Sequence, residues 1–341
     1  MLSEREFAEY IAAHIAEFMP ETFGGAEITV EETVKMNDDV RIYLAVRKDG
    51  EAAYPQIPVE AYYADYLNGE SLDEILGQMV EVRIRHAVKQ DRTDELLNMI
   101  KDYDSVKDAI HGRLVDPDLN KRSLEKLVSR PCGDFALTYQ IDIGAMSDND
   151  RSEYIVRVTK NNLKQWGVTE DDLYRDALAA DKKREPALYT MTDILVDLQS
   201  EMLGMGYTAE NYLIGDKTLP DDLEPPMFIM TYKDRAFGAS ILAQPDVLEK
   251  VGELLGENYF VIPSSIQECI VMRESDANAQ VLSQMCREIN ANEVKRDELL
   301  SDKVQHYDIK SKKLENAISW DNERQRSMEQ HPGRTNRRRG R

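Results

Sequence analysis

MFIMTYKDRAFGASILAQPDVLEKVGELLGENYFVIPSSIQECIVMR, residues 227–273, is the stretch whose patterning decides the fold. Residues 227–232 and 236–242 are apolar runs of strand length, and the polar residues 233–235 between them are short enough for a hairpin loop. Residues 259–262 and 266–272 are two further apolar runs. The pattern predicts two hairpins, with a different element between them.

The segment between the hairpins has the marks of a helix. Pro245 is tolerated in a first helical turn, Asp246 and Glu249 place negative charge near the helix N-terminus, and Gly256 can end the helix in a left-handed conformation. Its apolar residues share one face at helical spacing: Val247, Leu248, Val251, Leu254 and Leu255. The stretch therefore predicts a ββαββ unit whose helix lies on the sheet.

The flanking sequence extends this α+β pattern in both directions. Residues 27–36 and 40–47 alternate as an antiparallel pair. Ser71 caps a helix that has Glu74 at its third position, and residues 299–309 and 314–318 predict a final hairpin. The fold class is α+β, with mixed or mostly antiparallel sheets and packed helices. A Gly-, Asp- and Pro-rich loop at 205–226 divides the chain, giving expected lobes 1–205 and 206–320 and a disordered basic tail, 321–341.

Composition indicates a soluble protein without a metal centre. The chain is 42% hydrophobic and 31% charged, and no apolar run approaches the roughly 20 residues that span a bilayer. Acids stand at the N-terminus where a secretory signal carries basic residues, so we expect a cytoplasmic location and no membrane partner. Cys132, Cys269 and Cys286 are far apart and the histidines are scattered, so we expect no disulfide, bound metal or cofactor.

Charge is distributed unevenly between the body of the chain and its end. The net charge is −21, and because the last eight residues contain five arginines and no acid, the remainder carries −26. Those arginines are Arg334, Arg337, Arg338, Arg339 and Arg341. An acidic body repels nucleic-acid phosphates, so a nucleic acid partner is expected only through this tail. The alternative is a solvated, disordered end that aids solubility.

Reaction motifs do not select an enzyme class. GxSxG, GxxxxGK[ST], GxGxxG and HxE with PCxxC are absent. Ser264 and Ser265 stand at a strand end and are candidate nucleophiles, or else turn-forming hydroxyls after a proline. Asp142, Glu153 and Lys160 follow the order of a nuclease site spread over adjacent strands, although acids are abundant throughout this chain.

Four tyrosines, Tyr54, Tyr62, Tyr63 and Tyr66, cluster where the first hairpin passes into a helix. As a binding surface they could stack on bases or sugars. As structural residues they would form the amphipathic boundary between sheet and helix. No basic residues are interleaved with them, so both interpretations stay open.

Several stretches resemble a known family. They are YFVIPSSIQECIVM at 259–272, LNGESLDEILGQM at 67–79, NLKQWGVTEDDLYRDAL at 162–178 and AFGASILAQPDVLEKVGELLGENYFVIPSSIQE at 236–268. Over most of its length the chain resembles an uncharacterised family of Gram-positive bacterial proteins, a domain of unknown function often met near mobile genetic elements. The resemblance implies a cytoplasmic α+β protein and supplies no activity.

The sequence therefore leaves three functional hypotheses. The first is a non-enzymatic cytoplasmic binding or regulatory protein, linked to a mobile element and acting on a protein partner. The second is an enzyme, a metal-dependent nuclease or other hydrolase. The third is an acidic mimic of DNA, which requires acids arrayed along one ridge.

Overall fold

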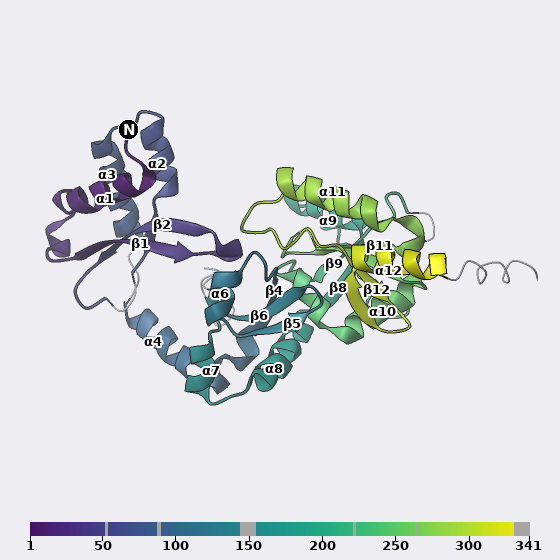
Figure 1. Ribbon diagram of the computed structural model, residues 1–341. Coiled ribbons are helices and arrows are strands. Elements are labelled where there is room, and N and C mark those ends of the chain that lie inside the picture. The colour runs from purple at the N-terminus through teal and green to yellow at the C-terminus, as the bar shows by residue number, and fades with distance from the viewer. Residues whose placement is uncertain (52–53, 87–89, 144–154, 221–222, 264, 331–341) are drawn as a thin grey trace, which may run out of the picture. The chain divides into compact units, whose positions relative to one another are not determined.

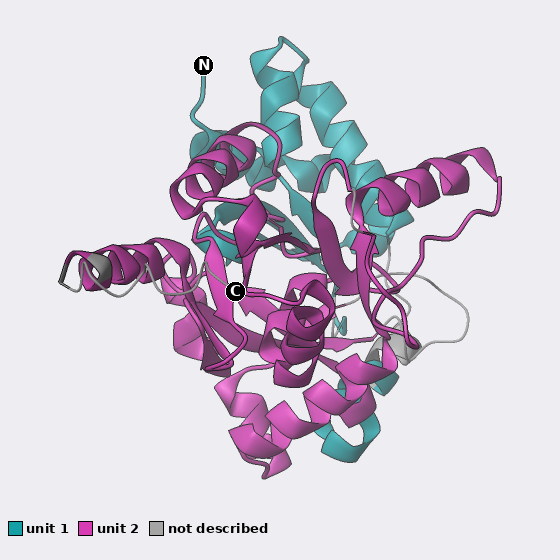
Figure 2. Ribbon diagram, turned by 90° about the vertical axis from the view of Figure 1, so that its right-hand side faces the viewer, with its two compact units in different colours: residues 1–106 teal, residues 107–341 magenta. Residues whose placement is uncertain are grey.

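The computed structural model describes residues 1–341 except 52–53, 87–89, 144–154, 221–222, 264 and 331–341. It separates into two compact units, Met1–Val106 and Lys107–Arg341 (Figure 2). The boundary expected near residue 205 lies inside the second unit, because strands on either side of that position pair with each other.

The first unit is a three-stranded antiparallel sheet with helices packed on it. Its strands are β1 (Glu27–Val34), β2 (Val40–Arg47) and β3 (Gln56–Pro58). Its helices are α1 (Glu4–His14), α2 (Glu60–Leu67), α3 (Leu72–Arg85), α4 (Gln90–Lys101) and α5 (Tyr103–Val106). The predicted β1–β2 pairing is confirmed, as is the capping box that Ser71 and Glu74 form at the start of α3.

The second unit is built on a six-stranded sheet in the order β13-β12-β10-β11-β9-β8, antiparallel throughout. Its strands are β8 (Pro186–Thr190), β9 (Phe228–Tyr232), β10 (Tyr259–Ile262), β11 (Cys269–Arg273), β12 (Gln305–Asp308) and β13 (Lys313–Asn316). Figure 1 labels four of these strands, β8, β9, β11 and β12. The predicted final hairpin is confirmed as β12 and β13.

A smaller antiparallel sheet belongs to the same unit. Its strands are β4 (Ile110–Val115), β5 (Ser129–Cys132), β6 (Phe135–Asp142) and β7 (Ile155–Arg157). The central strand β6 pairs with the other three. Together with the antiparallel pairings of the larger sheet, this confirms the predicted α+β class.

Helices of the second unit cover both faces of the six-stranded sheet. The helices of the whole unit are α6 (Lys121–Lys126), α7 (Lys160–Trp166), α8 (Glu170–Lys183), α9 (Met191–Leu203), α10 (Pro245–Leu255), α11 (Ala279–Asn292) and α12 (Ala317–Gln330), of which α8 packs on β4 of the smaller sheet. Helix α9 packs near Ile229, and α11 packs on Phe260. Helix α10 accepts a hydrogen bond from Tyr259, the strand neighbour of Phe260, so it lies on the opposite face (Figure 1).

The prediction of a strand at 236–242 is wrong. These residues lead into a 3-10 helix, Gly238–Ala243, because the backbone turns sharply where Arg235 and Phe237 take the left-handed conformation, with φ of 57° and 50°. Gly238 presses on β9 so closely that a Cβ there would lie 2.1 Å from Thr231 Oγ1. The partners of β9 are β8 and β11, so the unit is not the predicted ββαββ arrangement.

The C-terminal segment also differs from its prediction. Residues 321–330, expected in a disordered tail, belong to α12, whose Trp320 stacks on His306 with ring centroids 3.8 Å apart. The arginines from Arg334 onward lie outside the described residues. Within the described part of the chain, no helix combines the length and the apolar character needed to cross a membrane.

Candidate functional site

Helix α9 has its polar and apolar faces reversed relative to an ordinary surface helix. Its buried residues are Ile194, Asp197 and Ser200, two of which are polar. Its exposed side carries five large apolar side chains, Leu195, Val196, Leu198, Met202 and Leu203, with the polar Thr192 and Gln199 among them. A surface helix of a globular protein normally buries such residues against the core. Apolar side chains gathered on one exposed face indicate an interaction surface.

Hydrogen bonds hold the polar face of α9 inward. Asp197 Oδ2 accepts from Arg235 Nη2 at 2.5 Å, and Ser200 Oγ accepts from the backbone N–H of Tyr207 at 2.8 Å. Buried polar groups are tolerated when they are paired in this way. The cap is also satisfied, because Thr190 Oγ1 accepts from Asp193 N at 3.1 Å and Gly204 ends the helix in the left-handed conformation. The helix is therefore fixed with its apolar face outward.

The segment after α9 folds back along it and enlarges the apolar face. Met205 N donates to Ser200 O at 2.9 Å, and the Tyr207 hydroxyl donates to Asp193 Oδ1 at 3.0 Å. That hydrogen bond raises the pKa of Tyr207. We call Leu195, Val196, Leu198, Met202, Leu203, Met205 and Tyr207 the α9 surface.

The α9 surface is large for a protein without a partner. Met202 is 88% exposed, Met205 73% and Leu203 64%. From their exposed fractions the seven residues present on the order of 800 Å² of accessible surface, backbone and polar atoms included, which is about what one partner buries in an interface of standard size.

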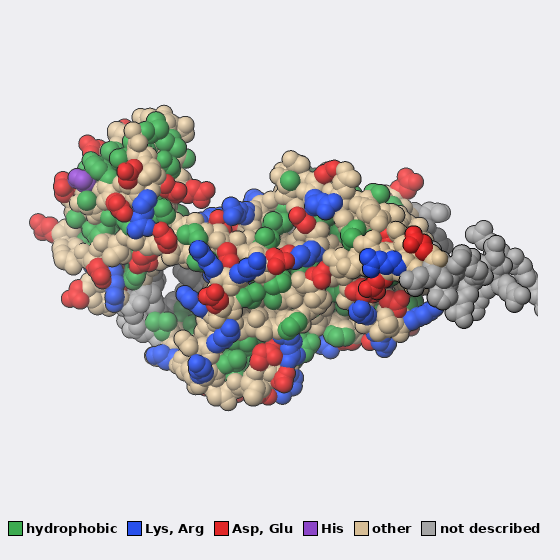
Figure 3. All heavy atoms as spheres, in the orientation of Figure 1, with side chains coloured by type: hydrophobic (Ala, Val, Ile, Leu, Met, Phe, Trp, Pro, Cys, Tyr) green, Lys and Arg blue, Asp and Glu red, His purple; other side chains and the backbone are tan. Residues whose placement is uncertain are grey.

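The acids of α9 are engaged by two neighbours, Arg235 and Tyr207. Asp197 and Glu201 both pair with Arg235, at 2.5 Å and 3.2 Å. Asp193 is engaged by the Tyr207 hydroxyl. On the face drawn in Figure 3, Lys and Arg side chains lie among Asp and Glu side chains over the second unit. Three carboxylates are thus matched by one guanidinium, so the apolar α9 surface has a net negative charge beside it.

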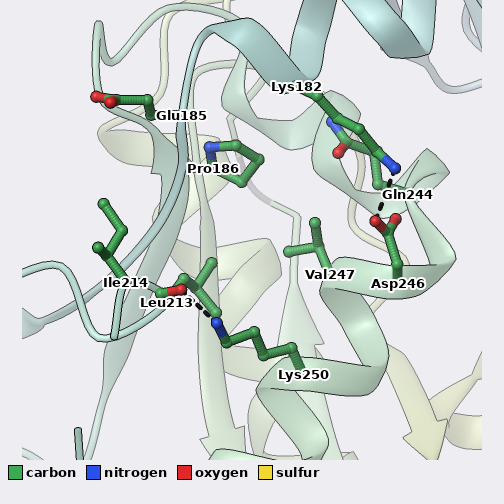
Figure 4. Close-up of a pocket in the computed structure, with 9 residues that line it drawn as sticks. All are labelled: Lys182, Glu185, Pro186, Leu213, Ile214, Gln244, Asp246, Val247 and Lys250. Carbon is green, nitrogen blue, oxygen red and sulfur yellow. Dashed lines mark hydrogen bonds and ion pairs between the residues drawn. The ribbon is translucent and has the colours of Figure 1, made fainter. Parts of the chain in front are cut away.

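A pocket lies in the same unit, where the end of α8, the start of β8, residues 213–214 and the start of α10 meet. Its volume is about 380 Å³. Figure 4 shows its lining residues: Lys182, Glu185, Pro186, Leu213, Ile214, Gln244, Asp246, Val247 and Lys250. Asn211 shapes one wall, because its side-chain oxygen accepts from Leu188 N and Leu213 N and its amide nitrogen donates to Pro186 O. These bonds tie the loop to β8.

Gln244, the residue before α10, is fully buried in the pocket wall. Its Nε2 donates to the Tyr232 hydroxyl at 2.7 Å, which lies 3.1 Å from Ser240 Oγ, and Ser240 Oγ donates to Phe237 O at 2.9 Å. Either hydroxyl can be the donor in the Tyr232–Ser240 contact; with the Ser240 proton directed to Phe237 O, Tyr232 donates to Ser240 and accepts from Gln244. This chain of donors assigns the amide orientation. It leaves Gln244 Oε1 a buried acceptor for which the described residues supply no hydrogen-bond donor.

Two lysines line the pocket in different states. Lys182 Nζ forms an ion pair with Asp246 Oδ2 at 2.7 Å. Lys250 Nζ donates to the backbone carbonyl of Leu213 at 2.6 Å, and no carboxylate of the described residues lies within 4.0 Å of it. Figure 4 shows Lys250 and Gln244 on opposite sides of Val247.

Of the two predicted serine candidates, the structure describes only Ser265. Ser264 lies outside the described residues. Ser265 is buried, and its Oγ accepts from Gln267 N at 2.9 Å, as expected for the turn-forming alternative. The neighbouring Glu268 has a raised pKa because of its burial.

The predicted nuclease residues occupy the small sheet and the helix after it. Asp142 ends β6 opposite Ile155, and Glu153 lies outside the described residues. Lys160 Nζ donates to the carbonyls of Leu124 and Glu125 in α6, at 3.2 and 2.9 Å. Across the described ranges, no three His, Cys, Asp or Glu side chains are grouped so that they could hold a metal ion.

The tyrosine cluster lies in the first unit and packs on α1. The ring centroids of Tyr63 and Tyr66 lie 5.6 and 5.3 Å from that of Phe7. The Tyr63 hydroxyl donates to Leu2 O at 2.9 Å, and the Tyr66 hydroxyl accepts from Leu2 N at 3.2 Å. Tyr62 packs on the same core, whereas Tyr54 donates to Glu31 at 3.2 Å. These are the contacts of the structural interpretation.

Sequence reasoning missed both the α9 surface and the acceptor of Gln244. The spacing of Asp193, Asp197 and Ser200 places polar residues on one side of a helix, a signal that the sequence contained. Nothing in the spacing says that this polar side is the inward one. Gln244 carries no motif, since its role depends on Tyr232 and Ser240.

The fold and these surfaces define an α+β protein with a preformed pocket and an exposed apolar helix. A family model described as a family of unknown function, DUF5688, matches residues 4–309, and the chain belongs to that family. No curated protein and no solved structure matches the chain.

Proposed function

We propose that this chain is a non-enzymatic binding protein that holds a protein partner on the α9 surface. The observation that carries the proposal is the reversed burial of α9, with Asp197 and Ser200 inward and Leu195 and Met202 outward. Exposed apolar area of this size is costly in water unless a partner covers it. The proposal keeps the expectations that the protein acts in the cytoplasm and that its relatives occur near mobile genetic elements.

The partner chemistry that fits is an apolar face of a helix in a different protein. The α9 surface is one helix with a short segment along it, so a second helix can pack against its ridges. Exposed Met202 and Met205 are unbranched and polarisable, which suits an adaptable contact. Two copies of a chain with net charge −21 repel each other, which disfavours self-association.

The test compares two surfaces of similar exposure. Leu195→Ser with Met202→Ser removes the centre of the α9 surface, while Val281→Ser changes an apolar residue of α11 that is 64% exposed. A partner is captured from the cells that make the protein, purified and titrated by calorimetry. We expect the double variant to lose about a hundredfold or more in affinity, and Val281→Ser to match the unmodified chain.

Two results would contradict the proposal. Equal affinity of the double variant and the unmodified chain would place the partner elsewhere. A dimer seen by sedimentation of the purified chain, and abolished by the double variant, would make a second copy the occupant. Thermal unfolding of each variant shows whether the fold is retained.

A further inference from the structure

We propose that the pocket beside α10 binds a small organic zwitterion with an apolar body, of the class of a free amino acid with an aliphatic side chain. This ligand site goes beyond the partner-binding role of the α9 surface and rests on different residues. The inference joins three features: an unpaired buried acceptor, a lysine without a carboxylate partner, and apolar walls between them.

The acceptor identifies one end of the ligand. Gln244 Oε1 is buried and has no hydrogen-bond partner among the described residues, while Nε2 donates to the Tyr232 hydroxyl. An unpaired buried carbonyl oxygen costs free energy that a donor restores. Figure 4 shows the amide extending toward Pro186, beside Lys182. A ligand ammonium group placed there supplies the missing donor.

The lysine identifies the other end. Lys250 Nζ donates to a backbone carbonyl, Leu213 O, and to no other acceptor in the described part of the chain, although the ammonium can donate three hydrogen bonds. A ligand carboxylate at this position gains a charge-assisted hydrogen bond. Lys182 is less available because Asp246 already holds it.

The space between the two ends limits the size and the polarity of the ligand. Leu213, Ile214, Val247 and Pro186 supply apolar lining, and about 380 Å³ suits a compact molecule. The charged lining residues balance, two lysines against Glu185 and Asp246. A polyanion such as a nucleotide would meet those carboxylates, whereas a zwitterion brings no net charge.

The experiment uses the full chain and isothermal titration with L-leucine. Two analogues test the ends separately: 3-methylbutylamine lacks the carboxylate, and 4-methylpentanoate lacks the ammonium. We expect each analogue to bind about tenfold or more weakly than L-leucine, because each loses one charge-assisted hydrogen bond. Gln244→Met and Lys250→Met should each cost about tenfold in affinity for L-leucine.

A control variant and a positioning variant accompany the test. Lys312→Met removes a lysine that pairs with Glu249 of α10 and is not part of the pocket lining, and it should leave affinity unchanged. Tyr232→Phe removes the hydroxyl that orients the Gln244 amide, so it should weaken L-leucine binding toward the level of Gln244→Met while leaving the Lys250 end of the site intact. The proposal is overturned by no binding of L-leucine up to roughly 10 mM, or by equal affinity for all three molecules. Loss of partner binding on the α9 surface would leave these results untouched.

Discussion

Helices α9 and α10 belong to the same unit and lie on opposite faces of one sheet. They differ in the side chains that they bury: those of α10 are apolar, and those of α9 are mostly polar. Helix α10 buries Val247, Leu248, Val251 and Leu255. Helix α9 buries Asp197 and Ser200 and exposes Leu195 and Met202. In α10 the apolar side chains supply stability to the unit, whereas in α9 Ile194 and Met191 pack on the core and the exposed apolar side chains contribute little.

The difference separates folding from function. A helix stabilises a fold by burying its apolar face, so α10 needs no further explanation. An apolar face kept in water by hydrogen bonds on the other side, as Arg235 and Tyr207 keep that of α9, makes sense when another molecule covers it. Mutations on the two helices should therefore differ in what they damage.

The largest expected effect is on α10. Leu248 is 4% exposed, and Leu248→Ala leaves a cavity where the helix meets the sheet. We expect a loss of about 3 kcal/mol in the free energy of unfolding, measured by urea denaturation. A loss below about 1 kcal/mol would mean that α10 is not the better packed helix.

A smaller loss should follow from removing the buried acid of α9. Asp197→Ala takes away the closer carboxylate of Arg235, and we expect a cost of about 2 kcal/mol. Glu201→Ala is the matched control, because it removes the more exposed partner of the same guanidinium and should cost less than about 0.5 kcal/mol. Equal losses would show that the inward polar face does not hold α9 in place.

Lowering the pH should reduce the free energy of unfolding through the contact of a third helix, α12, with His306. We expect this loss to be smaller than that caused by Asp197→Ala. His306 is buried under Trp320, and burial lowers its pKa although Glu274, Asp308 and Glu315 act in the opposite sense. The unfolded chain then binds a proton more readily, so stability is present above about pH 6.5 and falls as the pH drops below it. Urea unfolding between about pH 7.5 and about pH 5.5 should show this fall, and His306→Gln should reduce it. An unchanged pH profile in that variant would assign the dependence to other groups.

The smallest effect on stability is expected on the α9 surface itself. Leu195 is 57% exposed, so Leu195→Ser should change the free energy of unfolding by less than about 0.5 kcal/mol. Binding of an apolar fluorescent dye should fall in the same variant. A loss of stability near that of Leu248→Ala would show that Leu195 is packed rather than free for a partner.

Much of the fold could be predicted, because local patterns report it directly. Ser71 with Glu74, and Pro245 with Gly256, mark helix ends through bonds within a few residues, and both helices are present. Residues 236–242 could not be assigned in this way. Their apolar run is of strand length, but the left-handed Phe237 and the close approach of Gly238 to Thr231 depend on a neighbouring strand.

The candidate sites were less accessible to prediction. The tyrosine, serine and nuclease residues were selected by type, and the described ones pair with their own neighbourhood, as Tyr63 does with Leu2 and Lys160 with α6. The candidate sites that the structure shows depend instead on the orientation of α9 and on the buried acceptor Gln244 Oε1. Neither is a property of residue type.

Taken by itself, the sequence determined the α+β class, the position of α10 and the acidic charge of the chain, since periodicity, capping and composition are local quantities. The tertiary structure alone decided which side of α9 faces inward and which oxygen of the pocket lacks a donor. Both depend on partners distant in sequence. Arg235 lies 38 residues from Asp197, and Tyr232 takes the amide hydrogen that fixes Gln244.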